Sequence, residues 1–246
     1  MIPLRDLNPT RRVPLVTVLL IGINVLVFLY EWSLSEGALN QFVFQFGMIP
    51  ANITSNLDQY GYTIFSSMFL HGDWLHIGSN LLYLWIFGNN VEDRLGPLRF
   101  ILFYFITGVL AAGAQIAIGP DSTVPNIGAS GAIAGVLGAY LVLFPNARVQ
   151  TLIFWLYFIR IIEVSAVWLL GWWFLLQVLY GLGSLGLEQT GGIAFFAHIG
   201  GFVAGWLLIR PFAVGTTPRS SRDDLAIPTI DDIFTNRRRN DRWWDR

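Results

Sequence analysis

Six apolar runs constrain this chain more than any other feature of its sequence. They cover residues 15–32, 74–91, 98–119, 130–144, 165–186 and 192–209. A helix of about 20 mostly apolar residues crosses a bilayer, and these runs reach or approach that length. Only 13% of the residues are charged, whereas a soluble domain has about a quarter. The sequence therefore predicts an all-α membrane protein with six transmembrane helices, and it makes a soluble enzyme a poor interpretation.

The arginines give the orientation of this bundle. All 15 basic residues are Arg, and with six crossings every one of them falls on the side that holds both termini. The three loops on the other side, 33–63, 120–129 and 187–191, contain no Arg. Positive residues concentrate on the cytoplasmic side of membrane proteins. We therefore expect both termini to be cytoplasmic.

The predicted organisation has three parts. A cytoplasmic N-terminal segment, 1–14, precedes the membrane domain, 15–212. The first apolar run is longer than the core of a typical signal peptide and no clear cleavage site ends it, so we expect it to be retained. The tail, 213–246, is rich in Arg, Asp, Pro and Ser, a composition typical of disorder.

Two connecting segments also carry expectations. Residues 149–159 are apolar but too short to span, so we expect an interfacial segment that leads into the fifth helix. Arg160 and Glu163 follow it, and their spacing predicts a local ion pair. The loop 33–63 is long and contains several aromatic residues, which favours a structured element at the outer interface.

Three polar motifs lie at the starts of the second, fourth and sixth runs, which all cross from outside to inside. They are His71, His76 and Asn80; Gly128, Ser130, Gly131 and Gly135; and His198, Gly201 and Gly205. Polar residues at membrane depth are functional by default. The three motifs share the outer half of the bilayer, and the fourth run, about 22 Å long as a helix, is short for a bilayer. We therefore expect an outward-opening polar cavity with Ser130 at its floor.

The residue types in these motifs suit nucleophilic catalysis. A neutral His activates a Ser hydroxyl, and Ser130 lies at a helix N-terminus, where developing negative charge is favoured. His76 and Asn80 are four residues apart on one helix face and both donate hydrogen bonds. No carboxylate lies near His198 in the sequence, so the pattern predicts a Ser130–His198 dyad.

The glycines of the fourth and sixth runs have a structural interpretation. Gly131 and Gly135, like Gly201 and Gly205, show the four-residue spacing that permits close packing of helices in lipid. Close approach of these two helices would bring Ser130 within reach of His198. Gly128 is assigned to the same packing role.

Three other interpretations compete with catalysis. Each polar residue by itself could serve helix packing. Three His could bind zinc, but His71 and His76 are five apart and lack the Glu of a zinc-protease helix, so we expect no metal and no cofactor. A transporter needs polar groups along its path, and the odd-numbered runs offer little beyond Asn24, Gln115 and Gln177.

On these motifs the sequence resembles the rhomboid family of intramembrane serine proteases. The resemblance rests on Gly128-Ala-Ser130-Gly131, on His198 followed by Gly201 and Gly205, and on the spacing of His71, His76 and Asn80. It covers residues 1–212. It implies that Ser130 is the nucleophile and His198 the general base. His76, Asn80 and the Ser130 backbone N–H would form the oxyanion site, with His71 nearby.

The resemblance implies cleavage of transmembrane protein substrates in a bacterial or archaeal cell membrane. The net charge of −1 gives no reason to expect a nucleic acid partner, whereas membrane lipid surrounds the chain. The alternative is an inactive relative that binds or moves transmembrane helices.

This chain departs from the pattern of some family members at two places. Some members carry a Tyr four residues after the Ser, where this chain has Ala134, so another group must orient His198. Loop 33–63 also lacks the Arg of a Trp–Arg pair found in some members.

Overall fold

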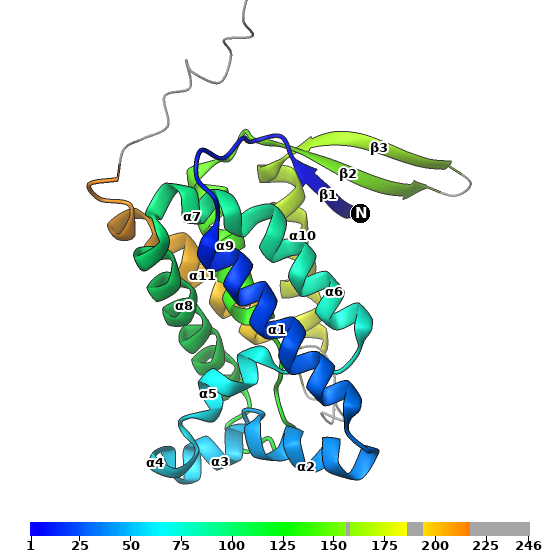
Figure 1. Ribbon diagram of the computed structural model, residues 1–246, viewed down its shortest axis with the longest axis vertical. Helices are drawn as coiled ribbons and strands as arrows, with labels where there is room; N and C mark the ends of the chain where they lie inside the picture. Colours follow the sequence, from blue (N-terminus) through cyan, green and yellow to red (C-terminus); the bar gives the residue numbers. More distant parts are fainter. Residues whose placement is uncertain (156–157, 186–193, 217–246) are drawn as a thin grey trace, which may run out of the picture. The chain divides into compact units, whose positions relative to one another are not determined.

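The computed structural model describes residues 1–155, 158–185 and 194–216 (Figure 1). Residues Met1–Gly215 form one compact unit. Most of the tail predicted for 213–246 lies outside the described residues, and so does the short outer loop 187–191.

The described part of the chain holds four helices that are long and apolar enough to cross a membrane. They are α1 (Leu15–Ser33), α8 (Pro97–Ile118), α10 (Ala166–Gly183) and α11 (Phe195–Phe212). Each coincides closely with a predicted span. The prediction of a mostly helical membrane protein is therefore confirmed.

The other two predicted spans are helical but less regular. The second predicted span is a continuous helical run made of α6 (Trp74–Tyr83), a π-helical segment (Leu84–Gly88) and α7 (Asn89–Leu95). The fourth is α9 (Ser130–Leu143). Both are consistent with six crossing segments.

Helix α9 lies at the centre of the bundle. It packs against α8, α10 and α11, and every residue from 132 to 140 is buried. A helix that is apolar on all sides is buried on all sides, and the many Gly and Ala residues of α9 let its neighbours approach. Because protein surrounds it, α9 can be shorter than a lipid-exposed helix.

Two carboxylates of α7 fix the start of α1 and the residues before it. Glu92 accepts hydrogen bonds from the backbone N–H groups of Val16 and Thr17 at 2.9 and 2.8 Å, and from the Thr17 hydroxyl at 2.8 Å. Asp93 accepts from the N–H groups of Arg11 and Arg12. The bonds to Glu92 satisfy N–H groups of the first turn that have no partner within α1.

A three-stranded antiparallel sheet is the main departure from the predicted all-helical chain. Its order is β1 (Ile2–Asp6), β2 (Arg148–Trp155) and β3 (Phe158–Ser165). It lies at the α7 end of the bundle (Figure 1). The segment predicted to be interfacial, 149–159, thus belongs to a hairpin, and the N-terminal segment adds a strand to it. The hairpin is rich in Val, Ile, Thr and aromatic residues, which favour strands.

The sheet also changes the predicted ion pair. Glu163 pairs with Arg148 at 3.5 Å, across strands β2 and β3. Residues three apart in a strand, such as Arg160 and Glu163, point to opposite faces. The predicted pairing assumed helical spacing and is replaced by a cross-strand pair.

The loop 33–63 is structured, as predicted from its aromatic residues. It forms four short helices, α2 (Glu36–Phe46), α3 (Pro50–Ser55), α4 (Leu57–Tyr60) and α5 (Thr63–Ser66), and a 3₁₀ turn (Ser67–Phe69) follows. These helices lie at the end of the bundle opposite to the sheet (Figure 1). Met48 and Asn126 exchange backbone hydrogen bonds of 3.0 and 2.8 Å. This pairing ties the loop before α9 to the α2–α5 segment.

Candidate active site

Gly128 sets the turn that leads into α9 and Ser130. Its φ of +121° is a conformation that side chains other than glycine rarely adopt. A Cβ at this position would also lie 2.6 Å from Nε2 of His76. The Gly128 N–H donates to the Ser67 carbonyl at 2.8 Å. Gly128 therefore serves the site through its backbone shape and its contact with His76, beyond the packing role predicted for it.

Ser130 and His198 are in direct contact. Ser130 is the first residue of α9, and His198 lies in the first turn of α11 with 8% of its surface exposed. The Ser130 Oγ is 2.7 Å from the His198 Nε2. The two residues are 68 positions apart in the chain. Their contact depends on the packing of two helices that begin at the same end of the bundle.

The other nitrogen of the His198 ring contacts α10. Its Nδ1 is 2.8 Å from Oε1 of Gln177. A carbonyl oxygen only accepts hydrogen bonds, so Nδ1 carries the proton. The unprotonated Nε2 then accepts the hydrogen bond of the Ser130 hydroxyl. This is the tautomer in which a histidine can remove the proton from a serine.

Small residues make the close approach of α9 and α11 possible. A Cβ on Gly201 or Gly205 would overlap the backbone carbonyls of Gly131 and Gly135. A Cβ on Gly131 or Gly135 would instead meet residues of α8, the nearest being Ala111 and Thr107. The glycines of α9 thus make room mainly for α8, while those of α11 make room for α9. Gly138, which the sequence analysis did not single out, lies against the backbone of Phe202.

His76 and Asn80 lie one turn apart on α6, beside Gly128. A Cβ on Gly128 would lie 2.6 Å from His76 Nε2 and 3.7 Å from Asn80 Nδ2. Asn80 is 6% exposed, and its Nδ2 has no hydrogen-bond partner among the described residues. The backbone N–H of Gly72 donates to His76 Nδ1 at 3.4 Å, which leaves Nε2 of a neutral ring as a donor. Two side-chain donors therefore lie close to the turn before Ser130.

His71 supports this pair from the turn before α6. Its ring packs against the His76 ring with centroids 5.0 Å apart. Its Nδ1 lies 3.3 Å from the carbonyl of Phe69, and its backbone N–H donates to Glu31 at 3.1 Å. Burial, with a further contribution from His76, lowers the pKa of His71 to about 4. The ring is therefore neutral at physiological pH.

Three contacts of the site were not predicted. Glu31, 2% exposed in α1, holds the backbone of His71; an acidic residue in an apolar run is the signal that could have identified it. Gln177 and Trp173 lie one turn apart on α10 and both contact His198, the Trp173 ring at a centroid distance of 5.9 Å. This chain has Ala134 where some family members have a Tyr, and these two residues of α10 contact the His198 ring instead. Gln177 is a polar residue in an apolar run, which was a usable signal.

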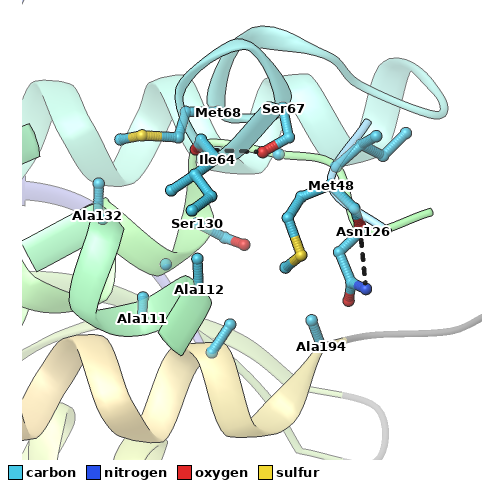
Figure 2. Close-up of a pocket in the computed structure, with 15 residues that line it drawn as sticks. Met48, Ile64, Ser67, Met68, Ala111, Ala112, Asn126, Ser130, Ala132 and Ala194 are labelled. Atoms are coloured by element: carbon cyan, nitrogen blue, oxygen red, sulfur yellow. Dashed lines mark hydrogen bonds between the residues drawn. The ribbon is translucent and has the colours of Figure 1, made fainter. Parts of the chain in front are cut away.

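A pocket opens beside the Ser130 hydroxyl (Figure 2). Its walls come from the 3₁₀ turn after α5, from α8, from the loop before α9 and from the start of α11. The lining includes Met48, Met68, Gly108, Ala111, Ala112, Asn126, Ser130, Ala194 and Ala197. Most of these side chains are small or flexible. The Ser130 hydroxyl faces this space, as Figure 2 shows.

The fold and the site together define a class: a helical membrane protein with a Ser–His pair in contact between two of its helices. Comparison with known proteins agrees with this description. A model of the rhomboid domain matches residues 58–213. That match covers more than half of the chain, which therefore belongs to the rhomboid family.

Several curated proteins are similar to this chain. "Rhomboid protein 1, mitochondrial" of Saccharomyces cerevisiae is 29% identical over 76% of this chain and 50% of its own length. "RHOMBOID-like protein 4" of Arabidopsis thaliana is 32% identical over 61% of this chain and 35% of its own length. "Rhomboid protease GluP" of Bacillus subtilis is 26% identical over 78% of this chain and 34% of its own length.

The chain spans between a third and a half of the length of these relatives. They come from a yeast, a plant and a bacterium, and one is named as mitochondrial. The comparisons support a multi-pass membrane protein. They do not support the expected restriction to bacterial or archaeal membranes.

Proposed function

We propose that this protein is an intramembrane serine endopeptidase in which Ser130 is the nucleophile and His198 the general base. The observation that carries the proposal is the 2.7 Å contact between the Ser130 Oγ and the His198 Nε2. This contact lies beside a pocket that the hydroxyl faces. Nucleophile and base within hydrogen-bond reach, with the base itself oriented by a third group, is the arrangement that acyl transfer requires.

The proposed reaction proceeds through an acyl-enzyme. His198 Nε2 accepts the Ser130 proton while Oγ bonds to the carbonyl carbon of the substrate. The oxyanion that forms accepts hydrogen bonds from His76 Nε2, Asn80 Nδ2 and the N–H of Ser130, which lies at a helix N-terminus. His198 then gives its proton to the leaving amine as the peptide C–N bond breaks. Water, activated by the same histidine, hydrolyses the acyl-enzyme.

The pocket beside Ser130 favours a small side chain next to the scissile bond. The cavity is small, about 40 Å³, so it suits a small side chain better than a bulky one. A substrate helix hides its carbonyls in internal hydrogen bonds, so the cleaved segment must be extended or easily unwound. We propose transmembrane proteins with small residues at the cut and helix-breaking residues beyond it as the substrates.

The proposed orientation places both termini in the cytoplasm. Within the described residues, the Arg-containing sheet and the α7–α8 turn lie at one end of the bundle, and the α2–α5 segment lies at the other (Figure 1). Ser130 lines the same pocket as Met48 and Ile64 of that segment. The positive-inside rule makes the Arg-rich end cytoplasmic. The active site then opens to the outer face.

Two readouts on reconstituted protein test the proposal: covalent labelling by a fluorophosphonate and cleavage of a labelled single-span reporter peptide. The wild type should give both, whereas Ser130→Ala and His198→Ala should give neither. Ser55→Ala, an exposed serine at the end of α3, is the matched control and should behave like the wild type. Equal labelling of the wild type and Ser130→Ala would overturn the proposal. Capture of the uncleaved reporter by the wild type, with no label, would favour the binding-only alternative.

A further inference from the structure

The two nitrogens of the His198 ring contact two different helices. Nε2 contacts Ser130 on α9, and Nδ1 contacts Gln177 on α10 at 2.8 Å. With Nδ1 directed at a carbonyl oxygen, one ring orientation and one tautomer are favoured. Rotation of the ring by 180° would place carbon atoms against both Ser130 and Gln177.

We infer that Gln177 is a positioning residue, which holds His198 in the tautomer and orientation that make Nε2 the base toward Ser130. This inference rests on the proposed function. Gln177 acts through His198, and no contact with the substrate is assigned to it. The site thereby becomes a Ser130–His198–Gln177 arrangement in place of the dyad predicted from the sequence.

An amide suits this position because the site lies among membrane helices. A carboxylate in the same place would be a buried charge, which is costly at membrane depth. The Gln177 amide supplies the same acceptor without a charge. It therefore orients the ring but stabilises the positive imidazolium less than a carboxylate would.

The contact also makes catalysis depend on the placement of α10. Trp173, one turn earlier on the same helix, packs against the His198 ring with centroids 5.9 Å apart. Of the four long apolar helices, α10 is the least buried, with 22% of its residues buried against 33–39% in the others. A shift of α10 away from α11 would remove both contacts with His198. The alignment of the base is thus linked to the most lipid-exposed of these helices.

Substitution of Gln177 tests the inference. Gln177→Met keeps the length of the side chain but removes the acceptor, whereas Gln177→Glu keeps a carbonyl oxygen at the same place. Leu175→Met, at a half-exposed position on the same helix, is the control. For each variant the measurements are the rate of fluorophosphonate labelling, and kcat and KM with the single-span reporter peptide.

Gln177→Met should lower the labelling rate and kcat by about 10- to 100-fold, the range expected when a hydrogen bond is lost and its donor is left without a partner. KM should stay near the wild-type value, because Gln177 does not touch the substrate. Per folded molecule, Gln177→Glu should restore most of the lost rate, because the cost of a buried carboxylate falls on stability and the acceptor for Nδ1 is kept. Leu175→Met should match the wild type. A Gln177→Met variant as fast as the wild type, or a folded Gln177→Glu variant no faster per molecule than Gln177→Met, would overturn the inference. A labelled wild type with an unlabelled Ser130→Ala keeps the proposed function in either case.

A spectroscopic measurement on the wild type decides the question even if a Gln177 variant does not fold. The chain has only 3 His residues, so ¹⁵N-histidine NMR spectra are simple, and His198→Ala identifies the signals of His198. We expect a neutral His198 ring protonated at Nδ1. A ring protonated at Nε2 would contradict the role of Gln177 as acceptor.

Discussion

Substitution of Gly205 by Ala provides a sharp test of how helix packing creates the Ser130–His198 contact. A Cβ at position 205 would overlap the Gly135 carbonyl oxygen and lie 2.7 Å from the Gly135 Cα. Carbon atoms in contact are about 3.5–4.0 Å apart, so α11 must move from α9 by about 1 Å. Neither partner can yield by turning a side chain, because the atoms that would clash belong to the backbone.

The consequence for activity follows from the short hydrogen bond that this packing holds. A 1 Å misplacement can cost about 100-fold in rate, and overpacking of a core costs about 1–3 kcal/mol of stability. We therefore expect Gly205→Ala to lower kcat roughly 100-fold and to lower the melting temperature. Reporter cleavage and thermal unfolding in the same detergent measure the two effects.

Gly113→Ala is the matched control for this test. Gly113 lies in α8, and a Cβ there would meet no atom within 4 Å. An Ala in a helix is more stable than a Gly by about 1 kcal/mol, so this variant should melt at or above the wild-type temperature with full activity. If Gly205→Ala matched Gly113→Ala in both measurements, the packing argument would be refuted.

Three further predictions concern Asn80, His71 and Glu92. Asn80→Ala should lower kcat by about 10²–10³ with an unchanged fold, and wild-type kcat would exclude Asn80 from the oxyanion site. Because the folded state keeps His71 neutral down to about pH 4 while the unfolded state takes up a proton near pH 6.5, the stability contribution of neutral His71 is complete above pH 6.5 and lost as the pH falls toward 4. His71→Asn should therefore reduce the fall of the melting temperature between pH 7.5 and 5. An equal fall in the wild type and the variant would contradict this. Glu92→Leu removes the acceptor of three hydrogen bonds at the start of α1 and should lower the free energy of unfolding by about 2–4 kcal/mol; chemical denaturation without such a loss would show that the bonds contribute little.

The elements that the sequence predicted well are those with a local physical signal. An apolar run of sufficient length has to be a helix in lipid, because its backbone groups find no other partners there. The runs at 15–32 and 98–119 therefore match α1 and α8 to within a few residues. Three polar motifs lie at the starts of runs that are predicted to cross in the same direction. Their positions likewise predict the depth of Ser130 without any tertiary information.

The small sheet shows where that local signal ends. β1 and β2 pair across more than 140 positions of sequence, with Ile2 opposite Leu152. Nothing near Ile2 in the sequence indicates such a partner. The hairpin 148–165 has a composition that favours strands, but a short apolar segment beside a predicted span also suits the membrane interface. The pairing of its two strands, with Ser165 opposite Arg148, is therefore seen only in the folded chain.

The sequence by itself determined that this chain is a membrane bundle, which end carries the positive charge, and that Ser130 and His198 share one depth. These properties depend on composition and spacing along the chain, because each apolar run responds to lipid through its own sequence. Only the tertiary structure decided that Gln177 and Trp173 of α10 contact the His198 ring, and that Gly205 lies against the backbone of Gly135. The depth and direction of a helix do not fix its rotation about its own axis or the helices that it packs against. The packing of side chains of particular shape removes that freedom and gives the site its geometry.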